Sequence, residues 1–289
     1  MLRIDTHHHV WDETVRPQEW MNDATREVIG GPYDFDDWNE AARESAIDFG
    51  IFVQTVAQPE ETPEILALAP SQDRLAGVVG WIDVDGSRPP GDLLDDLRQG
   101  PGGDHLIGIR VAGEYVADPD WIAGDPVRAT ASALAERDLS LDLLTDVRIL
   151  PAATRLAAAS PEARIVLDHL SKPTMARADF DFWAAAIRDL ARHPNVACKL
   201  SGYLAFDDEP MTAQRLRPYA ETVLESFGPD RVMFGSDWPV CILGGGYRRA
   251  VELAENLLAP LSEDEREQVW SGTARRWYPS IGTVVDRSR

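Results

Sequence analysis

The sequence predicts an α/β protein that folds as a single (β/α)8 TIM barrel. Short apolar segments rich in β-branched residues recur eight times, and segments with helical spacing of apolar residues lie between them. The apolar segments are nearly continuous rather than alternating with polar residues, which is typical of parallel strands covered on both faces. A chain of 289 residues, 44% of them hydrophobic, is long enough to build one such barrel around its own core.

The predicted strands and helices alternate along most of the chain. Strands are predicted over Leu2–His7, Ile51–Val56, Leu75–Val84, Leu106–Val111, Leu139–Thr145, Arg164–Leu170, Asn195–Leu200 and Arg231–Gly235. Helices are predicted over Asp125–Asp138, Phe180–His193, Leu216–Phe227 and Tyr247–Leu258. The alternative is an open, doubly wound sheet, which the absence of a Gly-x-Gly-x-x-Gly turn after the first strand disfavours.

The domain organisation is predicted to be simple. The chain shows no internal repeat and no second domain, so we expect residues 1–280 to form one barrel and residues 281–289 a C-terminal tail. The segment Asp12–Trp38 is polar and aromatic and predicts a long loop after the first strand.

Composition narrows the range of partners. The formal net charge is −21 and the pI is near 4.6, which disfavours binding to nucleic acid or to anionic membranes. The first residues lack the apolar h-region expected of a signal peptide, and no apolar run is long enough to span a membrane. Two cysteines are too few for a disulfide framework, which indicates a reducing, cytoplasmic compartment. The expected partner is a small-molecule substrate. The sequence is compatible with a homodimer and leaves the oligomeric state open.

The first predicted strand ends in three consecutive histidines, His7, His8 and His9. Side chains alternate along a strand, so Asp5, His7 and His9 are expected on one side and His8 on the other. Two imidazoles two residues apart can bind one metal ion, although such a pair is weak evidence by itself. Polar residues at the carboxyl ends of barrel strands form active sites, which makes this strand end a candidate.

Two further strand ends complete a candidate metal site. His169 follows the sixth strand and Asp237 follows the eighth; taken separately, they could be a core histidine and a helix N-cap. Together with His7 and His9 they suit one divalent ion, Zn or Mn, with an open position for water. We predict that His7, His9, His169 and Asp237 bind the metal and that Asp237 and His169 are catalytic.

Three basic residues, Arg110, Lys172 and Lys199, also lie at strand ends. One interpretation is that each forms a buried ion pair with one of the many carboxylates. In an acidic chain, however, converging cations indicate a site for an anionic group or a developing oxyanion. We predict that these three residues bind substrate together with Trp238, which follows Asp237.

Other kinds of catalytic site are not indicated. The fifth strand has no lysine that could bridge two metal ions, so at most one ion is expected, although Asp142 is not excluded as a ligand. No Gly-x-Ser-x-Gly nucleophile elbow is present. Cys198 and Cys241 are expected to be small buried residues rather than nucleophiles.

The strand-end motifs resemble those of amidohydrolase family 2. Residues 5–12 (DTHHHVWD) resemble the family opening Asp-Ala-His-x-His-x-Trp-Asp, and further matches continue in order to about residue 280. The nearest branch contains predicted metal-dependent hydrolases of sugar lactones, such as L-fucono-lactonase and L-rhamnono-lactonase. The other matching segments are residues 77–81 (GVVGW), 108–110 (GIR), 166–173 (VLDHLSKP), 198–202 (CKLSG), 233–239 (MFGSDWP) and 271–278.

Departures from the family pattern leave the substrate open. Val111 stands where many relatives have His or Gln, Ser171 replaces a glycine and Thr273 replaces an asparagine. We expect Val111 to lie at the mouth of the site, and the long Asp12–Trp38 loop is a second feature that leaves the substrate open.

The resemblance implies a barrel of the metal-dependent-hydrolase type that opens a lactone, a cyclic carboxylic ester. Our hypothesis is that Asp237 takes a proton from water and returns it to the leaving alkoxide. Some lactonases of this superfamily work without a tightly bound ion, so a site with none tightly bound stays open. The alternatives are a decarboxylase or hydratase of an unsaturated aromatic-derived acid, and a binding protein that has lost catalysis.

Overall fold

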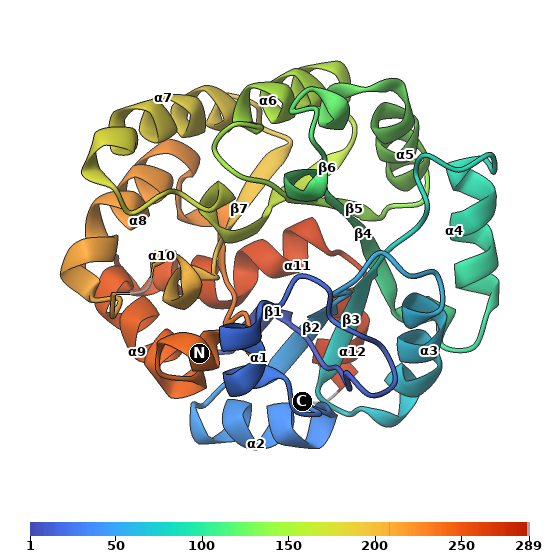
Figure 1. Cartoon of the computed structure of the whole chain (residues 1–289), viewed down its shortest axis with the longest axis horizontal. Coiled ribbons are helices and arrows are strands. Elements are labelled where there is room, and N and C mark those ends of the chain that lie inside the picture. Colours follow the sequence, from blue (N-terminus) through green and yellow to red (C-terminus); the bar gives the residue numbers. More distant parts are fainter. Residues whose placement is uncertain (208, 288–289) are drawn as a thin grey trace.

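The computed structural model describes residues 1–207 and 209–287 and shows eight parallel strands ringed by helices (Figure 1). The strand order follows the sequence from β1 to β8, and each strand pairs in parallel with the next. The predicted (β/α)8 barrel is therefore confirmed. The strands are β1 Ile4–His8, β2 Phe49–Val53, β3 Leu75–Gly80, β4 Leu106–Ala112, β5 Ser140–Leu144, β6 Arg164–Leu167, β7 Val196–Leu200 and β8 Val232–Phe234.

Most of the helices lie around the outside of the strands, as Figure 1 shows. The helix starts predicted at Asp125, Phe180 and Tyr247 agree with the structure, because apolar residues at helical spacing face the barrel there. The helices are α1 Asp23–Ile29, α2 Phe35–Glu44, α3 Glu61–Leu68, α4 Pro90–Gln99, α5 Asp125–Ala135, α6 Leu150–Ala159, α7 Phe180–Ala191, α8 Ala213–Phe227, α9 Tyr247–Leu258, α10 Glu263–Glu267, α11 Thr273–Trp277 and α12 Ile281–Arg287.

The segment predicted as one long loop, Asp12–Trp38, contains α1 and the start of α2. Both helices carry N-caps in the sequence: the side chain of Asn22 accepts a hydrogen bond from the amide of Thr25, and Asp34 forms a capping box with Asp37. We call residues 12–33 the β1–α2 excursion. The polar residues of Asp12–Trp38 include these caps, which is why polarity alone predicts a loop there.

The predicted C-terminal tail is also corrected by the structure. Residues Ile281–Arg287 form helix α12, in which Ile281 and Val285 are fully buried. They pack with Trp277 and Tyr278 against the interior side chains at the strand starts, such as Ile4 and Ile107. This C-terminal segment therefore closes the amino end of the barrel, opposite the end where polar residues gather.

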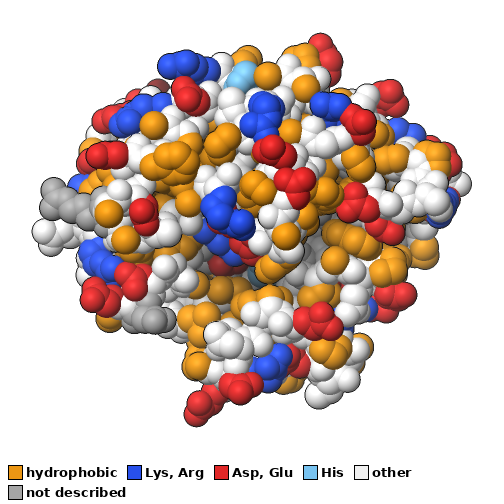
Figure 2. Space-filling view, turned by 45° about the horizontal axis from the view of Figure 1, so that its top comes forward, with side chains coloured by type: hydrophobic (Ala, Val, Ile, Leu, Met, Phe, Trp, Pro, Cys, Tyr) orange, Lys and Arg blue, Asp and Glu red, His pale blue; other side chains and the backbone are white. Residues whose placement is uncertain are grey.

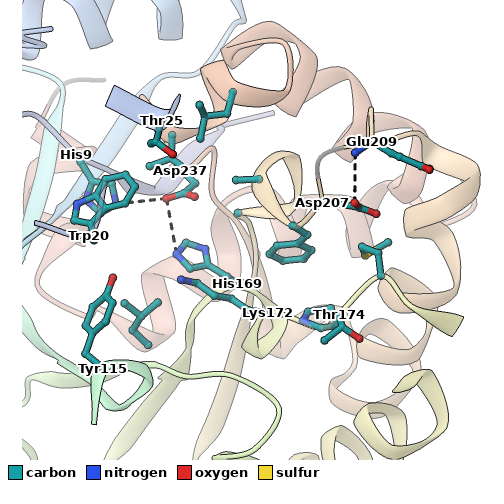
Figure 3. A pocket seen from close by; sticks show the side chains of 18 of the residues that line it. His9, Trp20, Thr25, Tyr115, His169, Lys172, Thr174, Asp207, Glu209 and Asp237 are labelled. Carbon is teal, nitrogen blue, oxygen red and sulfur yellow. Dashed lines mark hydrogen bonds and ion pairs between the residues drawn. The ribbon is translucent and has the colours of Figure 1, made fainter. Parts of the chain in front are cut away.

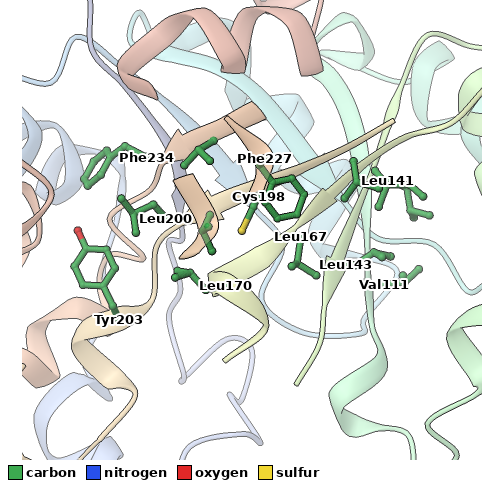
Figure 4. Packing of buried hydrophobic residues seen from close by; sticks show 14 of the residues in the cluster. Val111, Leu141, Leu143, Leu167, Leu170, Cys198, Leu200, Tyr203, Phe227 and Phe234 are labelled. Atoms are coloured by element: carbon green, nitrogen blue, oxygen red, sulfur yellow. The ribbon is translucent and has the colours of Figure 1, made fainter. Parts of the chain in front are cut away.

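A larger core fills the space between the strands and the surrounding helices (Figure 4). Strand residues alternate between this layer and the barrel interior. On β4, Arg110 faces inward, so Val111 faces outward and packs with Leu143 and Leu167. The expectation that Val111 lies at the mouth of the site is therefore wrong.

Within residues 1–207 and 209–287, no helix is both long enough and apolar enough to cross a membrane.

Candidate active site

Strand β1 turns His7 and His9 toward the barrel axis and His8 toward the helices. The ring of His8 stacks on Trp38 of α2 with a centroid separation of 4.3 Å. Asp5 also faces α2, although simple alternation predicts it on the side of His7. The pairing of β1 with β2 shifts register between Asp5 and His8, and this bulge reverses the alternation.

His169 lies immediately after β6, where the backbone takes an uncommon path. His169 and the three residues after it all have positive φ, between 43° and 58°, a conformation that costs energy for residues other than glycine. The turn is held by local contacts: Trp183 Nε1 donates to the carbonyl of Leu170 over 2.8 Å, and the hydroxyls of Ser171 and Thr145 lie 2.8 Å apart. This path of the backbone after β6 places the His169 ring at the barrel mouth.

Gly202, after β7, gives that ring its space. Its φ is +72°, and a Cβ added there would lie 2.6 Å from His169 Nδ1. A side chain at residue 202 would therefore displace the His169 imidazole.

Asp237 follows β8 and is fixed by the neighbouring strand β1. Its amide donates to the carbonyl of His7 over 2.8 Å, and the amide of His9 donates to the carbonyl of Trp238 over 2.7 Å. Asp5 accepts hydrogen bonds from both the amide and the hydroxyl of Ser236. These contacts join the first and last strands where the described residues show only one isolated bridge, so they close the barrel beside the site.

Three of the four predicted metal ligands, the histidines, converge on a carboxylate oxygen of the fourth, Asp237. Oδ1 of Asp237 lies 3.4 Å from His9 Nε2, 3.8 Å from His7 Nε2 and 3.8 Å from His169 Nε2. Figure 3 shows His9 and His169 directed at Asp237. All four side chains are almost fully buried. Two overlapping groups of buried side chains have donor atoms with the spacing of metal ligands: His7 with His9 and Asp237, and His7 with His169 and the neighbouring Asp168.

The second nitrogen of each ring has its own partner. His9 Nδ1 lies 2.6 Å from the carbonyl of Val53, which fixes the proton on Nδ1 and leaves the Nε2 lone pair facing Asp237. His169 Nδ1 lies 2.9 Å from Ser201 Oγ, and His7 Nδ1 lies 3.3 Å from Asp168 Oδ1. His7 Nε2 is buried and has no hydrogen-bond partner in the described chain. Three imidazoles and one carboxylate, with the Nε2 atom of His7 unpartnered among the described residues, fit a divalent ion of the zinc type.

Burial sets the charge states of these groups. It lowers the pKa of His7 and of His169 well below the usual range, so both imidazoles are neutral at pH 7, as metal ligands must be. For Asp237, burial alone raises the pKa, but His169 and His9 outweigh it and hold the pKa below its usual value. Asp237 is therefore a carboxylate at pH 7.

A buried charged cluster lies directly beneath the histidines. Lys199 Nζ is 2.5 Å from Asp142 Oδ2, 3.1 Å from Asp168 Oδ1 and 3.3 Å from His7 Nδ1. Tyr278, beside α12, donates to Asp142 over 2.8 Å. Lys199 is fully buried and is absent from the residues that line the cavity. The structure thus places Lys199 in the ion-pair role rather than in the predicted role of substrate binding.

A cavity of about 820 Å³ opens above the site. It is hollowed into a face where basic and acidic side chains are interspersed (Figure 2). Lys172, which lines it, forms an ion pair of 2.7 Å with Glu114, and Arg110 lies 3.9 Å from Asp168. Its charged lining side chains are three basic and three acidic residues: Arg110, Lys172 and Arg215, and Asp207, Glu209 and Asp237.

Trp238 is placed away from the cavity. It is 4% exposed, packs edge-on against Tyr33 at 5.3 Å, and does not line the space above Asp237. The predicted substrate contact of Trp238 therefore has no counterpart here. Sequence reasoning missed Trp20 and Tyr115, which do line the cavity (Figure 3). Both come from loops, where periodicity gives no signal.

An eight-stranded barrel with three imidazoles and a carboxylate at its strand ends fits the metal-binding hydrolases. The chain belongs to the amidohydrolase family, whose profile matches residues 4–280. The predicted family and the prediction of a hydrolase are thereby confirmed.

Its similarity to known proteins extends over nearly the whole chain. L-fucono-1,5-lactonases from Burkholderia multivorans and Burkholderia ambifaria are 36% and 32% identical to it, with 96% of this chain covered and 96% and 95% of theirs. A crystal structure of an amidohydrolase from Burkholderia multivorans with bound zinc is 34% identical, with a TM-score of 0.88 over 96% of this chain and 99% of that one. A 2,6-dihydroxybenzoate decarboxylase is only 14% identical, with a TM-score of 0.67, and shares the fold alone.

Proposed function

We propose that this amidohydrolase hydrolyses an uncharged sugar-acid lactone. The observation that carries the proposal is the convergence of His7, His9 and His169 on Asp237 Oδ1 at the floor of a cavity of about 820 Å³. The similarity to two L-fucono-1,5-lactonases supports the lactone as the substrate class.

The balance of charges in the cavity supports an uncharged substrate. Arg110, Lys172 and Arg215 each form an ion pair with a carboxylate. A substrate with carboxylate groups would have to compete with those partners, whereas hydroxyl groups can hydrogen-bond to both members of a pair. This argument favours a polyhydroxylated lactone over a dicarboxylate.

Asp237 acts as the base and then as the acid. Its carboxylate takes a proton from the water that attacks the lactone carbonyl, giving a tetrahedral intermediate. The ring C–O bond then breaks, and Asp237 returns the proton to the leaving alkoxide oxygen, so that the product is a hydroxy acid. Arg110 and Lys172 bind oxygen atoms of the substrate from the cavity wall.

A divalent ion, zinc by ligand type, would be held by His7, His9, His169 and Asp237. When bound, it supplies Lewis-acid polarisation.

A panel of aldonolactones tests the function directly. Hydrolysis is followed by proton release with the protein as purified, after chelator treatment, and after addition of Zn2+ or Mn2+. We expect activity on uncharged 1,5- or 1,4-lactones, and Asp237→Asn should lower kcat by about 100-fold or more. Wild-type rates in Asp237→Asn would contradict the role of this residue. Release of CO2 from a hydroxybenzoate would instead identify a decarboxylase.

A further inference from the structure

A second cavity of about 400 Å³ adjoins the one above Asp237. The two cavities share part of their walls, including Trp20, Thr55, Arg110 and Tyr115, so a ligand can extend from one into the other. We call the second space the aromatic side cavity, because indole or phenol rings from three separate segments line it. These are Trp20 in the β1–α2 excursion, Trp81 after β3 and Tyr115 after β4.

The side cavity lies at one end of the catalytic cavity. In Figure 3, Trp20 and Tyr115 lie on one side of Asp237, and Asp207 and Glu209 lie on the other. A lactone whose carbonyl is near Asp237 can therefore carry a substituent toward the aromatic end.

The floor of the side cavity is fixed by internal hydrogen bonds. The Gln54 amide donates to the carbonyls of Val56 and Gln58 over 2.6 and 2.8 Å. Buried Glu61 accepts from the hydroxyl of Thr55 and from the amide of Val56. Because these bonds hold the loop in shape, little ordering of this wall is needed when a ligand binds.

The Trp20 wall is also held in place. Its Nε1 donates to Gln18 Oε1 over 3.0 Å, and its ring packs edge-on against Trp11 at 5.9 Å. Gln18 is itself fully buried.

The chemistry of the lining selects an uncharged ring with one apolar face and polar edges. Its basic residue, Arg110, donates to the carbonyl of Gln54 and lies near Asp168, so its charge already has a partner, and its acidic residue is Glu19. Aromatic faces pack against C–H surfaces, while Gln58 and Glu19 can hydrogen-bond to hydroxyl groups. A sugar ring has both properties.

We propose that the aromatic side cavity is a subsite for a sugar residue attached to the lactone, so that the enzyme favours glycosylated aldonolactones over the bare ring. The inference rests on the proposed lactonase function. A cavity of this size falls within the range that encloses small ligands.

The test compares two lactones that differ by one sugar, glucono-1,5-lactone and cellobiono-1,5-lactone. Trp81 lines the side cavity but not the catalytic cavity, so Trp81→Ala removes one subsite wall and leaves the reacting groups in place. The wild type should have a kcat/KM roughly tenfold higher for the disaccharide lactone, and Trp81→Ala should abolish that preference without changing the rate on glucono-1,5-lactone.

Two further variants control the comparison. Trp121→Ala removes a half-buried indole that lines neither cavity, and it should keep the wild-type preference. Ala112→Phe fills the side cavity without removing a core residue. It should also abolish the preference for the disaccharide lactone, so the test stands even if Trp81→Ala folds poorly. An equal kcat/KM for both lactones in the wild type, or equal losses on both lactones in Trp81→Ala and Ala112→Phe, would overturn the subsite.

A binding measurement separates this inference from the lactonase proposal. If neither lactone is hydrolysed, the proposed function has failed for these sugars, but calorimetric titration with gluconate and cellobionate needs no turnover. The subsite requires cellobionate to bind about tenfold more tightly and requires Ala112→Phe to remove the difference. Equal affinities would exclude the subsite independently of catalysis.

Discussion

Ser236 donates both its backbone amide and its hydroxyl to the carboxylate of Asp5, over 2.8 Å and 2.6 Å. The same buried carboxylate accepts from Tyr247 of α9 over 2.8 Å and from Trp38 of α2 over 3.3 Å. Asp5 thus ties the residue before Asp237 to the strand that carries His7. This side chain therefore helps to set the relative position of these two candidate ligands, together with the hydrogen bond from the Asp237 amide to the His7 carbonyl.

We therefore predict that Asp5→Asn disorders the site although Asp5 does not face it. The amide would present hydrogens to groups that are themselves donors, at a cost of about 1–3 kcal/mol for an unsatisfied buried group. Unfolding in urea should show that loss of stability, and equilibrium dialysis should show weaker zinc binding by about 10-fold or more. Asp73→Asn, at an exposed aspartate, should change neither quantity. Wild-type zinc affinity in Asp5→Asn would contradict the positioning role.

The neighbouring histidines offer a direct test of the metal site. His7 Nε2 faces Asp237, whereas His8 stacks on Trp38 outside the site. We expect about one zinc ion per wild-type chain by elemental analysis, a strongly reduced zinc content in His7→Gln and wild-type content in His8→Gln. Equal zinc content in folded His7→Gln and His8→Gln would show that the metal lies elsewhere.

The pKa shifts predict how zinc binding depends on pH. Burial lowers the pKa of His7 and of His169, so both rings stay unprotonated below the usual histidine pKa of 6.5. Protons on these two rings should therefore compete with zinc only at a pH clearly under 6.5. Zinc affinity measured by competition with a chelator should be nearly constant from pH 7.5 to about 6. A steep decrease across pH 6.5 would show that these rings titrate normally.

Substitutions at Lys199 can distinguish a structural role of this residue from a role in substrate binding. Lys199→Met leaves Asp142 and Asp168 as buried carboxylates without their shared cation, which typically costs about 3–5 kcal/mol. The double variant Lys199→Met/Asp142→Leu should recover part of that loss, because it removes one unpaired charge. Urea unfolding measures both. If Lys199→Met is as stable as the wild type and differs only in a higher KM, the predicted role of Lys199 in substrate binding would be correct.

Gly202→Ala tests the strained turn around His169. The added Cβ would lie 2.6 Å from the His169 ring at a φ of +72°, so we expect a displaced ring and zinc binding weakened by about 10–100-fold. Gly228→Ala serves as the control, since Gly228 has a φ of +78° but its Cβ would approach only Asp230. Both variants should lose stability, and only Gly202→Ala should lose zinc. Unchanged zinc affinity in Gly202→Ala would contradict this account.

Helix α12 stands where the sequence predicts a tail, and its contribution to the stability of the barrel can be measured. Ile281→Ala and Val285→Ala each open a cavity at the closed end of the barrel, and a buried Ile→Ala change costs about 2–5 kcal/mol. A chain ending at Ser280 should be destabilised by more than either variant. Thermal unfolding of the truncated chain at the wild-type temperature would show that the segment is a dispensable tail.

The sequence alone determined the barrel, its strand order and the candidate metal ligands. Those features depend on local regularities: apolar segments, helical spacing, and histidine or aspartate where each strand ends. Parallel strands bring their carboxyl ends to one edge whatever the details, so His7, His9, His169 and Asp237 could be grouped without coordinates.

Only the tertiary structure decided which polar residues reach the cavity. Lys199 occupies a strand end as Arg110 does, but two buried carboxylates from other strands hold it below the site. A single bulge in β1 turned Asp5 away from His7, and loop conformation brought Trp20 and Tyr115 to the cavity wall. Such contacts join residues far apart in the chain, and sequence periodicity carries no information about them.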